Sequence, residues 1–332
     1  MSQFLEAPAA ALRVQRVLDC AEAFVARRSV NAGQRESLGW PLARLRSLAG
    51  NDYNSSLLWP FIHLPLLIYA GLQGEERPAL PLAAATTLLF AGLDLFDDVA
   101  DGDWPASAPG RSVEQVNLTA ATLLCALPQL ALAELDAPPA VLAAMQRTLA
   151  EGLLRMSAGQ QQDLASASAI RIRSTEIEAA VLAKSGEEPA IFGRLAAQLA
   201  QAPEELVETC GELGRAIGAG GQLASDCYEL FTDPAARDLA HGARTLPIVL
   251  HLERLEGDVR AEFLALLEQA RRDAAARETV RQRLRSGGQL RHCAFIVETW
   301  RQRALRLCRQ VNPLEPARGC LETMIGGISF FP

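Results

Sequence analysis

The chain has 332 residues, of which 49% are hydrophobic, 21% are charged and only 5% are aromatic. A core built mainly from Ala, Leu and Val suits closely packed helices, because Ala and Leu are among the strongest helix formers. The formal net charge of −7 and the lack of a basic cluster argue against nucleic acid or a polybasic membrane surface as a partner.

The N-terminal segment lacks a basic region followed by an apolar stretch, so it does not resemble a signal peptide. The seven cysteines are scattered and form no paired spacing, which is typical of buried thiols in a reducing compartment. We therefore expect a cytoplasmic protein without disulfides.

Helical patterning runs through the whole chain and is interrupted only by short turns containing Gly, Pro, Asn or Asp. The expected interruptions lie near 31–33, 50–54, 74–78, 102–110, 137–139, 185–189, 202–203, 232–234, 286–288 and 312–316. They separate about ten or more helices, several of them longer than about 20 residues. Because no linker or repeat divides the chain, we predict one all-α domain, 1–332, folded as a large helical bundle.

Three segments are apolar on nearly every helical face and are predicted to lie inside the bundle: Leu57–Ala70, Leu80–Leu95 and Leu118–Leu132. The apolar runs Leu57–Ala70 and Ala79–Leu93 fall short of the ~20 residues that a membrane-spanning helix needs. We expect buried core helices and no integral membrane protein.

The second apolar helix runs directly into a segment with five aspartates, Leu93 to Asp103. Asp94, Asp97, Asp98 and Asp101 share one side of this helix at ~100° per residue. A solvated helix end is the alternative, but negative charge opposes the dipole at a helix C-terminus. Hard cations such as Mg²⁺ take carboxylate ligands and bridge them to phosphates, so this face predicts a metal site.

A second acidic cluster follows at Gln222–Glu229, with Asp233 beyond it. Ser225, Glu229 and Asp233 are four residues apart and align along one face if the helix continues that far. By itself this pattern is that of an ordinary amphipathic stripe.

Together the two clusters resemble the Asp-rich motifs of the trans-isoprenyl diphosphate synthases. Asp97-Asp98-Val99-Ala100-Asp101 matches the DDxxD motif in full, and Gln222 to Glu229 resembles the second motif, Q-I-x-D-D-x-x-D, with Ser225 and Glu229 in place of two aspartates. Three weaker landmarks follow the family order: Gly159–Leu164 resembles G-Q-x-x-D-L, Lys184–Gly186 resembles K-T-G, and Gly242–Pro247 resembles G-K-x-T-L-P. Gly214 and Gly218 stand where the family has a G-x-x-x-G run.

The resemblance implies the isoprenoid synthase type of helical bundle, a homodimer, three Mg²⁺ ions and an allylic isoprenoid diphosphate as substrate. It implies Asp97, Asp101, Asp226 and Glu229 as metal ligands. The catalytic set that it implies is Asp97, Asp98, Asp101, Lys184, Gln222 and Asp226. The substrate-binding set that it implies is Arg111, Gln160, Asp163, Lys184, Ser185 and Arg244.

The sequence departs from this family where the second substrate, isopentenyl diphosphate, is usually bound. The basic G-K-R-x-R-P motif is replaced by Ser55–Pro60, which keeps only the proline, and Ala243 replaces the lysine of G-K-x-T-L-P. Each lost charge-assisted hydrogen bond removes roughly 1.5–3 kcal/mol. We therefore expect poor use of isopentenyl diphosphate, unless Arg44, Arg46 or another arginine supplies the charge.

Two small residues bear on the size of the pocket in this comparison. Gly92 lies five residues before Asp97, where short-chain synthases often place an aromatic residue, and Gly221 stands where relatives usually have Phe. Both predict a wide pocket.

The expected function is therefore a Mg²⁺-dependent prenyltransferase that ionises an allylic diphosphate and transfers the prenyl group. A class I terpene synthase, in which an internal double bond captures the cation, is the close alternative. A non-catalytic regulatory subunit of a heteromeric synthase ranks behind both, because such a subunit has no reason to keep crowded carboxylates.

Overall fold

The computed structural model describes residues 7–51, 59–104, 108, 110–167, 173–233 and 236–329, and the only regular secondary structure among them is helix. The chain divides into two compact units, each assembled from separated segments. The first unit contains Met1–Ala150, Ile191–Glu212 and Leu307–Met324, and the second contains Glu151–Ala190, Leu213–Arg306 and Ile325–Pro332. The all-α prediction is confirmed, while the assignment of residues 1–332 to one domain stays a prediction.

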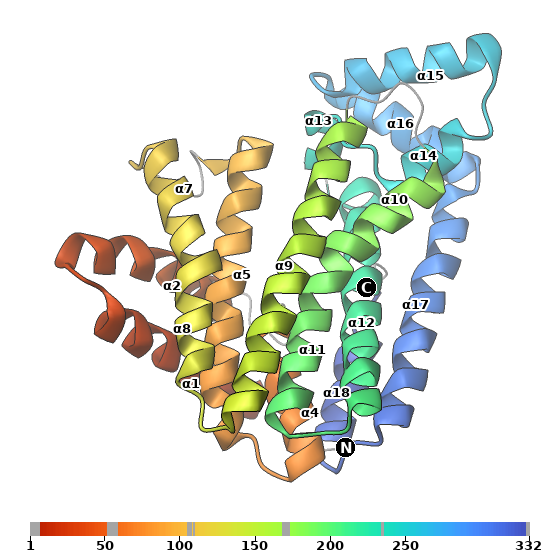
Figure 1. Ribbon diagram of the computed structural model, residues 1–332. Coiled ribbons are helices and arrows are strands. Elements are labelled where there is room, and N and C mark those ends of the chain that lie inside the picture. The colour runs from red at the N-terminus through yellow and green to blue at the C-terminus, as the bar shows by residue number, and fades with distance from the viewer. Residues whose placement is uncertain are drawn as a thin grey trace. The chain divides into compact units, whose positions relative to one another are not determined.

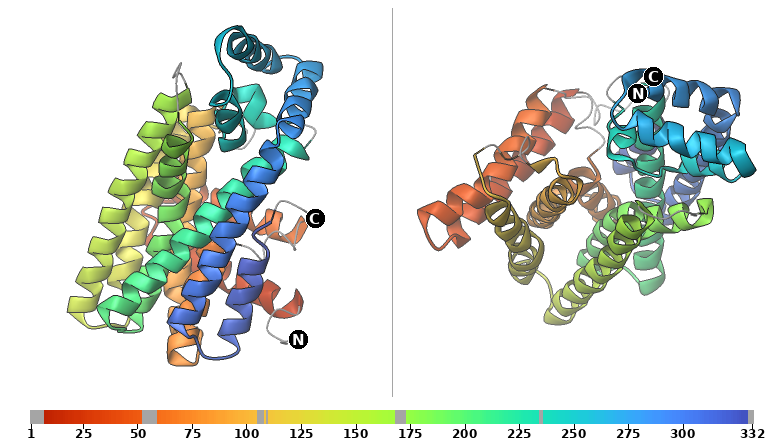
Figure 2. Two further views of the ribbon diagram at one scale, coloured as in Figure 1. Left: turned by 90° about the vertical axis from the view of Figure 1, so that its right-hand side faces the viewer. Right: turned by 90° about the horizontal axis from the view of Figure 1, so that it is seen from above.

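The first unit is organised around α5 (Leu80–Asp101), which packs against α1 (Ala7–Arg28), α4 (Pro60–Gln73) and α8 (Leu127–Ala133). It also contacts α2 (Ala32–Asn51) and α7 (Val113–Ala121). Figures 1 and 2 show α5 running alongside α7 and α8. All side chains from Leu82 to Leu89 are buried, which confirms α5 as a core helix. It ends where Gly102 adopts φ 80°, a left-handed conformation that terminates helices.

Several long helices pass from one unit into the other, and their bounds are as follows: α9 (Pro139–Ala167), α11 (Glu187–Leu199), α12 (Glu204–Phe231), α17 (Gln289–Val311) and α18 (Ala317–Gly326). With α1 and α5, the helices α9, α12 and α17 confirm the prediction that several helices exceed 20 residues.

The second unit adds five shorter helices, with bounds α10 (Ser174–Val181), α13 (Arg237–His241), α14 (Leu246–Leu252), α15 (Gly257–Ala270) and α16 (Ala274–Ser286). α14 contacts α10 and α16, and α15 contacts α13 and α16. Within this unit α12 runs beside α17 (Figure 1), where Gly220 faces the side chains of Trp300 and Ile328. The small residues of α12 therefore permit close approach of its neighbours.

Two helical stretches are long and apolar enough to cross a membrane by length and composition, Arg77–Ala100 and Val113–Ala133. The first stretch is longer than the apolar run Ala79–Leu93, because η1 (Arg77–Ala79) extends it at one end and the acidic segment extends it at the other. In the first stretch, 67% of the most apolar window is buried inside the protein, as in a core helix. In the second stretch, only 44% of the corresponding window is buried. The second stretch leaves an apolar face uncovered.

One expected turn, at 185–189, is wrong. The chain there remains helical through a π-helical turn, η3 (Leu182–Gly186), that leads into α11. Pro189 lies in the first turn of α11, directly after this π-helical turn, and the helix continues through it. A second π turn, η2 (Thr122–Ala126), joins α7 to α8.

The prediction that Gly92 widens a pocket is also wrong. A Cβ atom at this position would lie 2.9 Å from Leu124 Cγ and 3.0 Å from the Leu124 backbone nitrogen. Gly92 therefore lets η2 pack closely on α5. By contrast, a Cβ at Gly221 would meet no atom within 4 Å, so the space directly beside that residue is open, and the wide pocket there stays a prediction.

Candidate active site

The first acidic motif, Asp97, Asp98 and Asp101, occupies the last two turns of α5 in the first unit. Asp97 and Asp98 are half-buried, and the side chain of Asp101 lies outside the described residues. Burial raises the pKa of the neighbouring Asp94 to about 6; Arg44 opposes this rise, and the charges of Asp98 and Asp97 add to it. The segment thus concentrates negative charge at the end of an apolar core helix.

Arg44 contacts this motif within the first unit, while Arg111 contacts the helix that carries Arg44. Arg44 on α2 lies 2.8 Å from Asp98 and 3.1 Å from Asp94, measured from its Nη1 atom to a carboxylate oxygen. Arg111, which precedes α7, stacks over the ring of Trp40 with its guanidinium carbon 4.4 Å from the ring centroid. Sequence reasoning predicted Arg111 as a substrate ligand but missed Trp40, because no local pattern links residues so far apart.

The second acidic motif, Gln222, Asp226 and Glu229, lies on the last turns of α12 in the second unit. Gln222 Nε2 donates to Asp226 Oδ1 at 2.7 Å, and the Ser185 hydroxyl donates to Gln222 Oε1 at 3.1 Å. Glu229 accepts a hydrogen bond from the Asp238 backbone N–H at 2.6 Å, at the start of α13. The structure therefore brings Ser185 and the second motif together.

The predicted stripe of Ser225, Glu229 and Asp233 is interrupted, because α12 ends at Phe231 and Asp233 lies beyond it. The carbonyl oxygens of Leu230 and Asp233 both accept hydrogen bonds from Arg281, so this helix end is held from α16. Asp233 therefore does not share a helical face with Ser225 and Glu229.

Close backbone contacts join the weaker landmarks in the second unit. A Cβ on Gly159 of α9 would lie 2.9 Å from the Lys184 backbone nitrogen, and one on Gly218 of α12 would lie 2.1 Å from the Ser185 carbonyl oxygen. A Cβ on Gly214 would similarly meet the Pro189 carbonyl oxygen at 2.1 Å. These glycines let α9 and α12 approach the turn that carries Lys184 and Ser185, both of which are half-buried.

The other predicted substrate ligands have less direct support. Gln160 lies on α9 with its Oε1 atom buried and without a hydrogen-bond partner in the described part of the chain, and the side chain of Asp163 lies outside it. Arg244 precedes α14; burial lowers its pKa, Glu268 raises it, and Arg260 lowers it again. Arg244 therefore belongs to a charged group around α15.

A buried ionic group that sequence reasoning missed lies next to Ser185. Glu187 is fully buried and contacts Arg155 on α9 at 2.7 Å and Arg215 on α12 at 2.5 Å. An acid in the first turn of a helix normally indicates a favourable interaction with the helix dipole, so nothing in the sequence signals its burial. Arg155 also lies 3.9 Å from Glu151, so the group contains two arginines and two glutamates beside the Lys184 turn.

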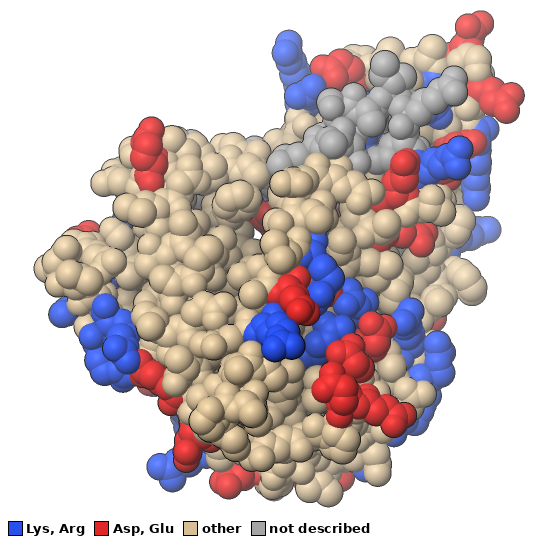
Figure 3. Space-filling view, in the orientation of Figure 1, with Lys and Arg blue, Asp and Glu red and all other residues tan. Residues whose placement is uncertain are grey.

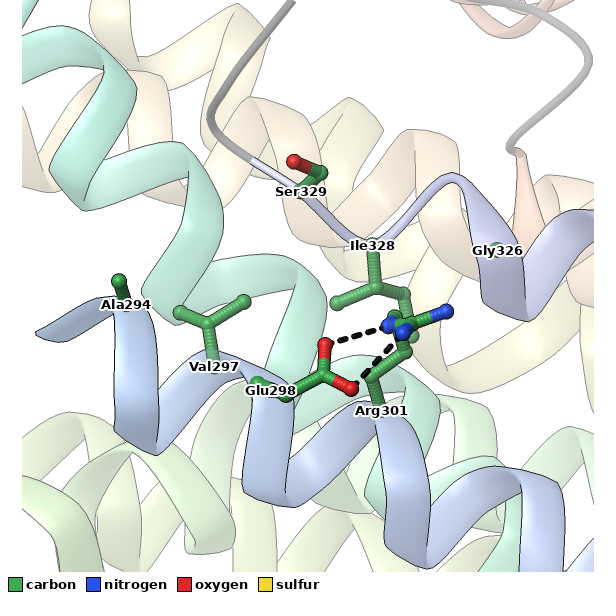
Figure 4. Close-up of a pocket in the computed structure, with 7 residues that line it drawn as sticks. All are labelled: Ala294, Val297, Glu298, Arg301, Gly326, Ile328 and Ser329. Atoms are coloured by element: carbon green, nitrogen blue, oxygen red, sulfur yellow. Dashed lines mark hydrogen bonds and ion pairs between the residues drawn. The ribbon is translucent and has the colours of Figure 1, made fainter.

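A pocket of about 300 Å³ lies elsewhere in the second unit, between α17 and the residues that follow α18 (Figure 4). Its one ion pair joins Glu298 to Arg301 through two contacts of 2.7 and 2.8 Å. None of its lining residues belongs to the predicted site, so this pocket is separate from both acidic motifs.

Two of the predicted metal ligands, Asp97 and Asp101, belong to the first unit, and the other two, Asp226 and Glu229, belong to the second. No group of three or more His, Cys, Asp or Glu side chains within the described ranges is arranged to hold a metal ion by itself. The predicted ligands form two pairs, Asp97 with Asp101 and Asp226 with Glu229, and all four offer the oxygen donors that Mg²⁺ prefers.

Comparison with known proteins identifies the relatives of this chain. The sequence matches the family model described as polyprenyl synthetase over residues 63–284. No curated protein matches the sequence.

Solved structures match closely in fold. A geranylgeranyl pyrophosphate synthetase from Pyrococcus horikoshii is 18% identical with a TM-score of 0.80, covering 96% of this chain and 97% of its own. A decaprenyl diphosphate synthase from Rhodobacter capsulatus is 17% identical with a TM-score of 0.79, covering 97% and 98%. A polyprenyl synthetase from Streptomyces coelicolor is 17% identical with a TM-score of 0.78, covering 98% and 100%. The predicted isoprenoid synthase fold is confirmed.

Proposed function

Since this chain belongs to the polyprenyl synthetase family, we propose that it is a Mg²⁺-dependent prenyltransferase that ionises an allylic isoprenoid diphosphate and transfers the prenyl group. The observation that carries this proposal is the first acidic motif at the end of α5, whose preceding turns are buried. Carboxylates clustered at the end of an apolar helix suit a reaction that needs a charged binding site beside an apolar region that excludes water.

Each part of the site would have a defined role. Asp97 and Asp101, with Asp226 and Glu229, would hold three Mg²⁺, which when bound neutralise a diphosphate and stabilise it as a leaving group. Lys184 and Arg111 would bind the diphosphate oxygens through charge-assisted hydrogen bonds. Ser185 and Gln222 would orient Asp226, because their hydrogen bonds fix one of its two oxygens.

The acceptor of the prenyl group is proposed not to be isopentenyl diphosphate. Trp59, at a position that is basic in most relatives, stacks on Phe61 with ring centroids 5.2 Å apart, and Phe61 stacks on Phe90 at 3.8 Å. Arg46 ion-pairs with Asp19 and Glu22 on α1, and Arg44 is engaged by Asp94 and Asp98. Neither arginine restores a cationic cluster for a second diphosphate.

This aromatic stack favours a second candidate, a class I terpene synthase, in which an internal double bond of the substrate captures the cation. Aromatic faces attract cations through their negative electrostatic potential, and Phe90 lies on the same α5 face as Asp94, one turn away. The open space beside Gly221 would accommodate a folded substrate.

Incubation with Mg²⁺ and geranyl, farnesyl or geranylgeranyl diphosphate, with and without isopentenyl diphosphate, tests both candidates. Mass spectrometry should detect released diphosphate and a prenylated or cyclised product without efficient elongation. A Michaelis constant for isopentenyl diphosphate in the low micromolar range, with efficient elongation, would contradict the assignment of the acceptor. No turnover of any allylic diphosphate would contradict the function itself.

A homodimer is proposed as the working form, joined through the outer face of α7 and α8. This dimer face is exposed at Leu118, Ala121, Cys125, Ala126 and Leu130, and no charged residue occurs between Glu114 and Glu134. Figure 3 shows few charged side chains over α7 and α8. We also propose a cytoplasmic location, for which the scattered spacing of the seven cysteines is the support.

A further inference from the structure

Glu187, at the start of α11 in the second unit, is a fully buried carboxylate held from two sides. Its Oε1 atom lies 2.7 Å from Arg155 Nε on α9, and its Oε2 atom lies 2.5 Å from Arg215 Nη2 on α12. We call these three side chains the Glu187 clamp. Taking a carboxylate out of water carries a desolvation penalty that the attraction to its partners does little more than offset. The clamp is therefore better explained by what it positions than by the stability it adds.

The face of α12 that carries Arg215 also contacts the turn before Glu187. Arg215, Gly218 and Gln222 are three and four residues apart, so they share one side of the helix. A Cβ on Gly218 would lie 2.1 Å from the Ser185 carbonyl oxygen, and Gln222 Oε1 accepts a hydrogen bond from the Ser185 hydroxyl at 3.1 Å. One face of α12 thus meets η3 and the start of α11 at three successive points.

α9 contacts the same turn from the other side, since α9 and α12 flank α11 (Figure 1). Arg155 lies four residues before Gly159, and a Cβ on Gly159 would lie 2.9 Å from the Lys184 backbone nitrogen. A Cβ on Gly186 would lie 3.2 Å from Arg215 Cγ, so this glycine leaves room for the arginine side chain. Because π turns are rare and occur mostly as single turns at functional sites, the contacts from both helices suit a turn whose shape matters.

We propose that the Glu187 clamp positions the π turn so that Ser185 meets Gln222 of the second acidic motif. The hydrogen bond from Ser185 continues through Gln222 to Asp226 at 2.7 Å. Glu187 is thus a positioning residue that acts through Ser185. Its effect on turnover rests on the proposed function, because the clamp serves the same site.

Amide hydrogen exchange of the full chain without substrate, followed by mass spectrometry, tests the clamp directly. Arg155→Gln removes one of its two arginines at a side chain that is 46% exposed, so the chain should still fold. The backbone amides of residues 182–186 should then exchange about tenfold faster, because the turn opens locally. The amides of α15, in the same unit, should keep their rates.

Kinetics with an allylic diphosphate test whether the clamp acts through Ser185. Arg155→Gln should lower kcat about tenfold, since a small displacement of a group in the site slows the reaction. Ser185→Ala should also lower kcat, because it removes the hydroxyl that contacts Gln222. The double variant should lose clearly less than the product of the two single effects, because both substitutions disturb one contact. A role in stability alone would not couple them in this way.

Two controls match these substitutions. Glu151→Gln removes the other carboxylate near Arg155, at 3.9 Å, and leaves the clamp intact. Glu208→Gln breaks the 3.1 Å ion pair with Arg194, which also joins α11 to α12 but lies in the first unit. Both controls should keep kcat and the exchange rates over 182–186.

The inference is overturned if Arg155→Gln leaves exchange over 182–186 unchanged, or if Glu208→Gln accelerates it equally. Fully multiplicative effects of Arg155→Gln and Ser185→Ala on kcat also overturn it. Should Arg155→Gln fail to fold, Arg155→Lys, which keeps the charge but not the planar guanidinium, decides by the same measurements. An inactive wild-type chain would defeat the proposed function, while the exchange rates would still decide the role of the clamp.

Discussion

At the scale of single residues, the aspartates between Leu93 and Asp103 differ in whether they lie on α5 or beyond its end. Asp97 belongs to the last turns of α5, whereas Asp103 lies beyond the helix end at Asp101. Asp97→Asn removes one charge from the proposed metal site while keeping the side-chain shape. We expect kcat with an allylic diphosphate to fall by at least about a hundredfold, the size of effect typical for a group that stabilises charge in the transition state.

Asp103→Asn is the control for that substitution and should keep near-normal kcat. Circular dichroism should show the same helix content for both variants. Near-normal turnover by Asp97→Asn would remove this residue from the site.

The raised pKa of Asp94 leads to a prediction about stability. Burial raises this pKa from 3.8 to about 6, Arg44 opposes the rise, and the charges of Asp98 and Asp97 add to it. The folded chain therefore binds the proton more tightly than the unfolded chain, and the stability that this proton provides is lost as the pH rises through about 6. Asp94→Asn should accordingly raise Tm at pH 8 and have a smaller effect at pH 5. Scanning calorimetry at the two pH values measures this, and a lower Tm at pH 8 would mean that the contact with Arg44 outweighs the burial.

At the scale of elements, α12 contains two glycines three residues apart that have opposite surroundings. A Cβ at Gly218 would lie 2.1 Å from the Ser185 carbonyl oxygen, whereas one at Gly221 would meet nothing within 4 Å. Gly218→Ala should therefore destabilise the fold by about 1–3 kcal/mol through overpacking. Gly221→Ala should stabilise it by roughly 0.5–1 kcal/mol, because Ala is the better helix former.

Urea unfolding of the two single variants compares them under the same conditions. Because Ser185 also donates to Gln222, Gly218→Ala should lower kcat as well. Equal stabilities of the two variants would contradict the close contact between α12 and η3.

The same helix shows what the sequence could and could not predict. The order of the landmarks predicted that Lys184, Ser185 and the second acidic motif serve one site, and the contact of Ser185 with Gln222 agrees. The sequence predicted a break in the helix at the π turn that carries Lys184. A π turn inserts one extra residue and shifts the helical periodicity, and a sequence pattern cannot distinguish this shift from the end of a helix. Gly92 was misread for a related reason, since an absent side chain can mean either an open pocket or a close neighbour.

At the scale of the whole molecule, composition and periodicity were sufficient to predict an all-α fold. Long-range partners were not predictable, because Arg44, Trp40 and Glu187 owe their roles to residues far away in the sequence. The two units also interleave along the chain, and no linker marks a boundary between them. The sequence therefore predicted the site residues that belong to local motifs, and not those whose partners lie far away in the chain.

The apolar stretch over α7 and α8 carries the last prediction, on assembly. An uncovered apolar face of this kind is normally buried by another protein surface, and the uncharged run between Glu114 and Glu134 can meet its own copy without unpaired charge. Leu118 is 71% exposed on this dimer face, and Phe295 on α17 is equally exposed outside it. Leu118→Glu places two like charges in the proposed interface and should convert a dimer of about twice 35.7 kDa into a monomer, while Phe295→Glu should leave the dimer intact. Light scattering at micromolar concentration measures both masses. A wild-type monomer, or a Leu118→Glu variant that remains dimeric, would show that α7 and α8 do not join two copies of this chain.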